Sequence, residues 1–134
     1  MFEYRGTNLI IRCCEEPAAD AALSVWMPPS LQEALRHIPT KKHAGILAKL
    51  AARRQYLANV GQLRSPDHWN TEGNLPNDKP FYAIKADRVR AYGWFSSHHK
   101  GIFYISHFAF KKGQKLAQED TNRVIRNWRQ IEEQ

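Results

Sequence analysis

Residues 81–110 have the sequence FYAIKADRVRAYGWFSSHHKGIFYISHFAF, and this stretch decides the fold class. Aromatic and β-branched residues are concentrated in Phe81–Ala86, Val89–Phe95 and Ile102–Phe110, which is typical of strands. Only Asp87–Arg88 separates the first two segments, a spacing that is typical of a two-residue hairpin. The stretch therefore predicts three consecutive antiparallel strands.

Two helices are predicted before these strands. Ser30 can act as an N-cap and Glu33 follows three residues later, so the pair has the pattern of a capping box, and Pro39 ends this helix. Residues 40–60 then show a helical spacing of apolar side chains, and Gly61 provides a C-terminal stop. We expect these two segments to form a helical hairpin.

The remaining segments complete the predicted topology. An apolar run in residues 8–14 predicts a first strand within an N-terminal extension, 1–29, and residues 64–80 are rich enough in proline and asparagine to predict a long loop. A last helix is predicted at 118–133. The order of elements predicts a single α+β domain whose antiparallel sheet combines the N-terminal strand with the three C-terminal strands, with the helices on one side.

The basic charge of the chain is concentrated in two blocks. The 134 residues carry a net charge of +7, and the pI is about 9.6. Residues 31–64 and residues 81–115 each carry +6, so the rest of the chain is acidic on balance. Such blocks favour a polyanionic partner, either a nucleic acid or an acidic protein.

Composition also indicates the compartment. No apolar run approaches the roughly 18–20 residues that span a bilayer, and acidic Glu3 stands where a secretory signal has basic residues. The cysteines are the adjacent Cys13 and Cys14, which do not suggest a disulfide framework. We therefore expect a cytoplasmic protein that does not bind membranes.

The C-terminal strands carry the candidate site. By strand alternation, Tyr92 and Trp94 share one face, and Tyr104, Ser106 and Phe108 share a face of the neighbouring strand. Cations beside exposed aromatic planes suit single-stranded RNA; the alternative is that the aromatic residues form the core and the basic residues a solvated rim. The candidate residues of this surface are Lys85, Arg88, Arg90, Tyr92, His107, Lys111, Lys112 and Lys115.

A second basic strip lies on the helical hairpin. Lys42, Lys49 and Arg53 fall along one edge of the apolar face of the second helix, and we predict that they dock on RNA or on the ribosome. No metal site or cofactor is predicted. His98 and His99 lack further ligands at suitable spacing, carboxylates are scarce in the basic block, and no phosphate-binding glycine motif is present.

Three short motifs resemble the RelE/ParE superfamily of toxins, most closely its phage-derived, HigB-like branch. They are YAIK at 82–85, VRAY at 89–92 and ISHFAFKKGQK at 105–115, and the resemblance extends over about residues 30–131. It implies a RelE-like fold and the toxin of a type II toxin-antitoxin system. Such a toxin cleaves mRNA on the ribosome and is inhibited by a cognate antitoxin, here expected to be a helix-turn-helix protein.

By the same resemblance, Lys85, Arg90, His107, Lys111 and Lys112 are the catalytic candidates. Metal-free cleavage of RNA needs a base for the 2′-hydroxyl, a proton donor for the leaving oxygen and cations on the phosphorane. Arg90 suits the last role, because a guanidinium binds phosphate in a fork. A lysine (Lys85 or Lys111) or His107 then remains as the base or acid.

Two alternatives stay open. The chain departs from the family pattern, with Lys85 where an arginine is usual and Ala117 or Gln118 where a proline is usual before the last helix. This favours an inactive RelE-fold protein that binds RNA or an antitoxin. The other alternative is a gyrase-targeting, ParE-like toxin.

Overall fold

The computed structural model describes residues 2–16, 27–113 and 115–133 as one α+β unit. The helices are α1 (Pro29–Leu35), α2 (His43–Val60) and α3 (Gln118–Glu132), with a 3-10 turn, η1 (Thr40–Lys42), before α2. The strands are β1 (Phe2–Arg5), β2 (Ile10–Cys13), β3 (Trp69–Asn74), β4 (Pro80–Ala86), β5 (Val89–Phe95) and β6 (Ile102–Phe110).

The strands form one six-stranded mixed sheet in the order β1-β2-β6-β5-β4-β3. The β4-β5-β6 meander and the turn at Asp87–Arg88 are as predicted, and Asp87 takes a left-handed conformation there, with φ of 53°. The prediction of an antiparallel sheet is wrong for β2, which pairs in parallel with β6. Local sequence patterns indicate a strand, but they do not indicate the direction of a partner about 90 residues away.

Two strands were not predicted. β1 pairs with β2, and β3 lies within the segment 64–80 that the sequence predicted to be a loop. The side chains of β3 are mainly polar, but Trp69 is buried and stacks on Tyr82 of β4, with ring centroids 4.4 Å apart. This tertiary contact and the pairing with β4 hold a strand that has little strand propensity of its own.

The N-terminus of α1 also differs from its prediction. The N-cap residue is Pro28 and no side chain caps the helix, so the predicted capping box is wrong. Instead, the Ser30 hydroxyl is hydrogen-bonded to the Glu15 carboxylate and accepts the backbone N–H of Phe108 at 2.8 Å. The predicted end of α2 is confirmed, because Gly61 follows it with φ of 95°.

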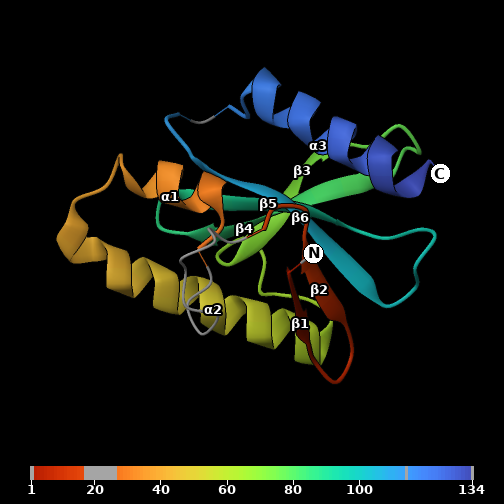
Figure 1. The fold of residues 1–134 in the computed structure, drawn as a ribbon, viewed down its shortest axis with the longest axis horizontal. Helices are drawn as coiled ribbons and strands as arrows, with labels where there is room; N and C mark the ends of the chain where they lie inside the picture. Colours follow the sequence, from red (N-terminus) through yellow and green to blue (C-terminus); the bar gives the residue numbers. More distant parts are fainter. Residues whose placement is uncertain (1, 17–26, 114, 134) are drawn as a thin grey trace.

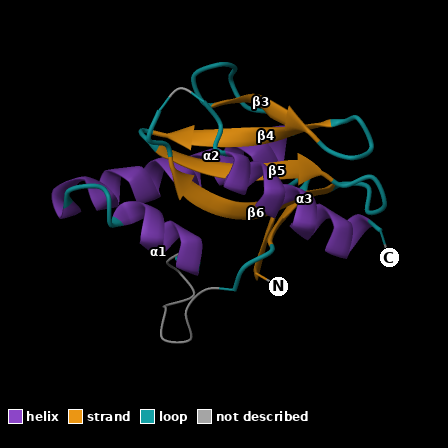
Figure 2. Ribbon diagram, turned by 90° about the horizontal axis from the view of Figure 1, so that it is seen from above, coloured by secondary structure: helices purple, strands orange, loops and turns teal. Residues whose placement is uncertain are grey.

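Helices cover both faces of the sheet, so the predicted one-sided packing is wrong. Figure 1 shows α3 on one side of the strands and α1 and α2 on the other, and Figure 2 shows the same layers from above. Each face has its own apolar layer. The layer under α1 and α2 includes Ile11, Leu31, Ile46, Leu57 and Ile105, and the layer under α3 includes Phe81, Trp94, Tyr104, Val124 and Trp128.

A bulge in β6 changes which residues share a face. Tyr92 pairs with His107 but Gly93 pairs with Ile105, so Ser106 is the extra residue. As a result, Tyr104 lies in the layer under α3 while Phe108 lies in the layer under α1 and α2. The expectation that these two side chains share a face is therefore wrong.

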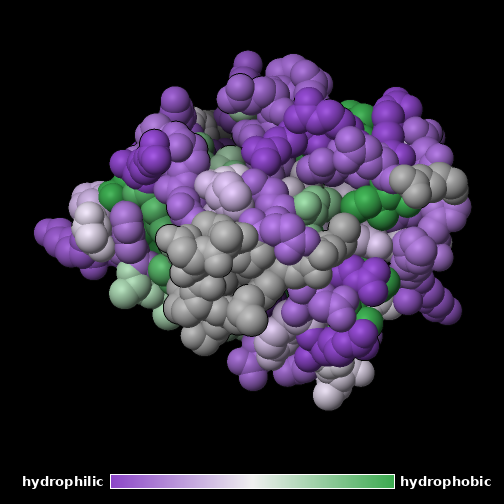
Figure 3. Space-filling view, viewed as in Figure 1, coloured by the Kyte–Doolittle hydropathy of each residue, from purple (hydrophilic) through white to green (hydrophobic). Residues whose placement is uncertain are grey.

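The aromatic residues of these strands belong to the core. Tyr92, Trp94 and Tyr104 are each at most 3% exposed, so they do not form an open stacking surface for RNA. Where described residues face the viewer in Figure 3, the surface is mainly hydrophilic. Among the described helices, none combines the length and the apolar character that crossing a membrane requires.

Candidate functional site

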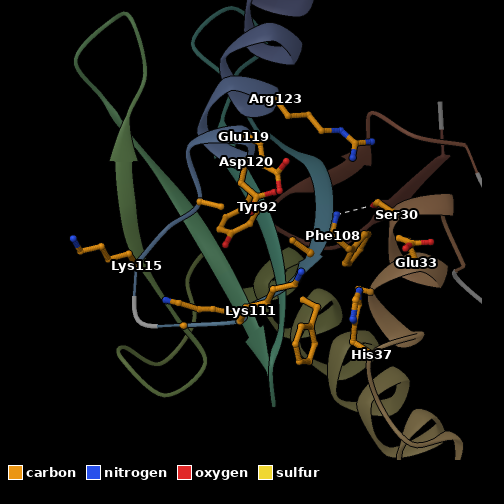
Figure 4. Close-up of a pocket in the computed structure, with 16 residues that line it drawn as sticks. Ser30, Glu33, His37, Tyr92, Phe108, Lys111, Lys115, Glu119, Asp120 and Arg123 are labelled. Carbon is orange, nitrogen blue, oxygen red and sulfur yellow. Dashed lines mark hydrogen bonds between the residues drawn. The ribbon is translucent and has the colours of Figure 1, made fainter.

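A cleft of about 310 Å³ opens where α1, the end of β6 and the start of α3 meet. Figure 4 shows Glu33 and His37 on the side of α1, and Asp120 and Arg123 on the side of α3. Charged side chains of both signs line it. The cations are Lys111, Lys112, Lys115 and Arg123, and the carboxylates are Glu33, Glu119 and Asp120.

The β4–β5 turn holds the backbone that carries the cleft lysines. Arg88 donates from Nε to the carbonyl of Lys111 at 3.1 Å and from Nη2 to the carbonyl of Lys112 at 2.9 Å. Its guanidinium also lies over the ring of Phe110, 4.9 Å from the centroid. Arg88, which the sequence predicted to contact RNA, therefore positions Lys111 and Lys112 for the cleft.

His107 lies behind the cleft wall and is only 1% exposed. Its Nε2 is 2.8 Å from Oδ1 of Asp120, and its Nδ1 is 2.8 Å from the hydroxyl of Ser106. Asn127 in turn donates to the Ser106 hydroxyl at 2.8 Å. Both ring nitrogens are thus used inside the protein, while Asp120 faces the cleft.

Tyr92 joins this buried group to the cleft. Its ring centroid is 5.4 Å from that of His107, and the residue lines the cleft although it is only 2% exposed. Burial raises the pKa of Tyr92 above its usual range, and the charges of Asp120 and Glu72 raise it further. The phenol therefore stays protonated near neutral pH, and its O–H can donate a hydrogen bond.

Glu72 of β3 is a charged residue of this region that sequence reasoning missed, because it lies in the segment predicted as loop. Its Oε1 is 4.0 Å from Nζ of Lys111, and its side chain is only 11% exposed. At that distance Glu72 is a nearby negative charge for the Lys111 ammonium, and its Oε1 is buried without a hydrogen-bond partner among the described residues.

Arg90 and Lys85 are neighbours in the β4–β5 register and do not line the cleft. Arg90 donates from Nη1 to the carbonyls of Asp87, at 2.7 Å, and Val89, at 3.1 Å. Burial lowers the pKa of Arg90, and the nearby Glu72 opposes this shift. Of the lysines and the arginine that the sequence had grouped, Lys111 and Lys112 line the cleft, whereas Lys85 and Arg90 do not.

The predicted basic strip of α2 forms a different surface. Nζ of Lys49 is 2.7 Å from Oδ1 of Asp87, and this hydrogen bond, with the charges of Lys42 and Arg53, lowers the pKa of Asp87. Arg53 donates from Nη1 to the carbonyl of Lys85. Lys49 thus contacts the β4–β5 turn and Arg53 contacts β4, and none of Lys42, Lys49 and Arg53 lines the cleft.

The expected scarcity of carboxylates at the site is wrong. The sequence showed few acidic residues within the basic block, but the fold brings Glu33, Glu72, Glu119 and Asp120 to the block from α1, β3 and α3. Local sequence patterns do not predict this grouping of carboxylates, because the four residues are up to 87 positions apart. Among the described residues, no group of three or more His, Cys, Asp or Glu side chains is placed to hold a metal ion.

Comparisons with protein-family models, curated proteins and solved structures found no match for this chain. The class of protein is therefore described by its fold and by its candidate site. It is an α+β protein with a mixed sheet and a charged, cation-rich cleft whose floor includes a protonated tyrosine.

Proposed function

We propose that this chain is a RelE-like toxin of a type II toxin-antitoxin system and that it cleaves ribosome-bound mRNA without a metal ion. The observation that carries the proposal is the cleft, whose lining includes four cations together with Tyr92 and Asp120. The proposed partners are the ribosome, mRNA and a helix-turn-helix antitoxin, and the proposed location is the cytoplasm. The resemblance to the HigB-like branch supports this choice.

Phosphate binding is assigned to the lysines after β6. Lys112 and Lys115 are exposed, and neither has an ion pair with a described residue, so both are free to meet phosphates. Lys111 lines the cleft, and its Nζ is 4.0 Å from the Glu72 carboxylate. An ammonium group stabilises the charge that develops on a phosphorane, as a positioned cation does in other phosphoryl-transfer sites.

Proton transfer is assigned to Asp120 and Tyr92, because these two groups lie at the cleft. The carboxylate of Asp120 takes the proton of the 2′-hydroxyl, whose oxygen then forms a bond to the adjacent phosphorus. The bond from phosphorus to the 5′-oxygen breaks, and the Tyr92 hydroxyl gives its proton to that oxygen. The products are a 2′,3′-cyclic phosphate and a 5′-hydroxyl, and His107 holds Asp120 in place.

The decisive experiment is to induce the protein alone and to map transcripts by primer extension. We expect growth arrest, with cuts at in-frame codon positions of translated mRNA. The double variant Lys112→Ala/Lys115→Ala should lose at least about 100-fold in cleavage rate, whereas Lys79→Ala/Lys100→Ala, which removes two exposed lysines elsewhere, should cut normally. Intact transcripts during growth arrest would exclude the nuclease.

A second candidate is a RelE-fold protein that binds RNA or an antitoxin without cutting. The observation that favours it is the placement of His107 and Arg90. Both ring nitrogens of His107 and Nη1 of Arg90 are hydrogen-bonded within the protein, and neither residue lines the cleft. In that case, a labelled oligoribonucleotide should bind in the cleft and remain intact after long incubation. Cleavage that depends on Asp120 would contradict this candidate.

A further inference from the structure

A second hollow of about 380 Å³ lies along α2 and shares no lining residue with the cleft. It runs between α2 and the chain segment that connects α2 to β3. We call it the α2 groove, and its lining residues are Lys49, Ala52, Arg53, Tyr56, Leu63, Arg64 and His68. No carboxylate is among them, although the chain has 13 acidic residues.

The wall on α2 presents cations at fixed positions. Lys49 and Arg53 are four residues apart and so lie one above the other on the helix. Lys49 is held by Asp87 at 2.7 Å, and Arg53 is held by the carbonyl of Lys85. Because the two side chains are already ordered, little conformational entropy is lost when they bind an anion.

The opposite wall is also tied to the sheet. The carbonyl of His68 accepts the backbone N–H of Lys85 at 2.8 Å, and the next residue, Trp69, is buried. Arg64, whose guanidinium is 3.8 Å from the carboxylate of Asp67, is exposed at the rim. The α2 groove therefore has positive charge on both walls.

Tyr56 gives the α2 groove an aromatic surface. It is 54% exposed, and with Val60 it is one of the two large hydrophobic residues that are exposed in the described part of the chain. Ala52 and buried Leu63 supply an apolar floor beside it. Because the Tyr56 ring is about half exposed and lies beside cations, it is not part of the hydrophobic core and is accessible to a ligand.

We propose that the α2 groove binds single-stranded RNA, with a base stacked on Tyr56 and phosphates at Lys49, Arg53 and Arg64. Every base has a flat face that can stack on an aromatic ring, and cations along the walls follow the backbone. The inference rests on the proposed function for the class of ligand. It adds a contact outside the cleft, where the strand or ribosomal RNA is held without being cut.

The test uses a fluorescein-labelled, 2′-O-methyl oligoribonucleotide, which cannot be cleaved, and the background Lys112→Ala/Lys115→Ala, which weakens the cleft. Tyr56→Ala should weaken binding by roughly 5- to 150-fold, the range for loss of one stacked base. Tyr56→Phe should bind within about twofold of the parent. Val60→Ala removes the other large exposed hydrophobic side chain of α2 and should have no effect.

A second readout is photo-crosslinking of a 4-thiouridine oligoribonucleotide, with adducts expected on Tyr56. Unchanged affinity of Tyr56→Ala without such adducts would overturn the inference, and so would competition by a glutamate-rich peptide stronger than that by RNA. The proposed function is tested separately. If Tyr56→Ala binds and cleaves RNA normally, only the proposal that the α2 groove binds RNA is rejected. If binding depends on Tyr56 but the unmodified protein does not cleave RNA, only the proposal of nuclease activity is rejected.

Discussion

At the scale of single residues, His107 shows how a candidate catalytic group can have a structural role. Its two ring nitrogens join Ser106 to Asp120, and Asp120 is the group that reaches the cleft. Both ring nitrogens of His107 are satisfied when the Ser106 hydroxyl donates to Nδ1 and the Nε2–H group donates to the Asp120 carboxylate. His107 therefore orients Asp120 and fills space between β6 and α3.

The substitution His107→Ala tests this role. It removes a buried ring and leaves the Ser106 hydroxyl without its acceptor, so we expect a loss of about 2–4 kcal/mol in the free energy of unfolding. Urea denaturation followed by tryptophan fluorescence measures it. If stability is unchanged while the acid limb of the pH–rate profile disappears, His107 is itself the titrating acid or base.

Glu132 makes stability depend on pH. Its buried carboxylate accepts hydrogen bonds from Trp94 Nε1, the Ser96 hydroxyl and the His98 backbone N–H. Burial raises its pKa, but these hydrogen bonds outweigh burial, and the pKa lies below the ordinary value of 4.5. A carboxyl with a depressed pKa stabilises the fold above its unfolded-state pKa and loses that contribution as the pH falls through the folded-state pKa.

We therefore expect Glu132→Gln to lower the free energy of unfolding by about 1.5–3 kcal/mol at pH 7, the range for hydrogen bonds to a charged group. The difference from the unmodified protein should shrink below about pH 4, where the wild-type carboxyl is itself protonated. Thermal denaturation at a series of pH values measures both effects. A difference that is the same at pH 3 and pH 7 would show that the charge of Glu132 does not contribute.

At the scale of elements, the β5–β6 pair depends on a glycine that allows close approach. A Cβ at Gly93 would lie 2.6 Å from Cε1 of Phe103 and closer still to the carbonyl oxygen of Tyr104. Gly93→Ala should therefore destabilise the protein by about 1–3 kcal/mol. Gly45 is the matched control, because a Cβ there meets nothing within 4 Å and alanine should stabilise α2 by about 0.5–1 kcal/mol.

Denaturation midpoints of the two alanine variants should thus move in opposite directions. The same direction for both would mean that backbone freedom, and not the contact with β6, decides the effect at Gly93.

Elements with local signals were predictable, and elements that depend on distant contacts were not. β4, β5, β6 and the end of α2 follow from alternation, a two-residue turn and a C-terminal glycine. β3 is held by the stacking of Trp69 on Tyr82, and the bulge at Ser106 depends on how β6 meets β5. Neither feature has a sequence pattern that distinguishes it from a loop or from a regular strand.

The candidate site was predictable in part for the same reason. Lys111, Lys112 and Lys115 follow one another after a predicted strand, so their presence at one place could be inferred from the sequence. Asp120 belongs to the predicted last helix, but its contact with His107 needs the packing of α3 on β6. Tyr92 was a candidate for RNA contact with the core as the alternative, and the structure buries it at 2% exposure.

At the scale of the whole molecule, whose net charge is +7, cations gather on two separate surfaces, the cleft and the α2 groove. Glu33, Glu119 and Asp120 line the cleft beside its cations. In the α2 groove, the carboxylates that pair with Lys49 and Arg64, which are Asp87 and Asp67, lie outside the lining. Under the proposed function, both surfaces attract RNA by their cations, but only the cleft has carboxylates as well as a phenol among its lining residues.

This division predicts how RNA binding depends on salt. For single strands, the slope of log affinity against log salt is about −0.7 per phosphate neutralised, so Lys112→Ala/Lys115→Ala should reduce the slope by about 1.4. Lys79→Ala/Lys100→Ala removes the same charge from exposed positions outside both surfaces and should leave the slope unchanged, because counterions are released only where a cation meets a phosphate. Anisotropy titrations of the 2′-O-methyl oligoribonucleotide between 50 and 200 mM salt, roughly the range over which such slopes are resolved, measure it. If both double variants reduce the slope equally, RNA responds to the net charge of the molecule. The proposal that the cleft lysines bind the phosphates would then be wrong.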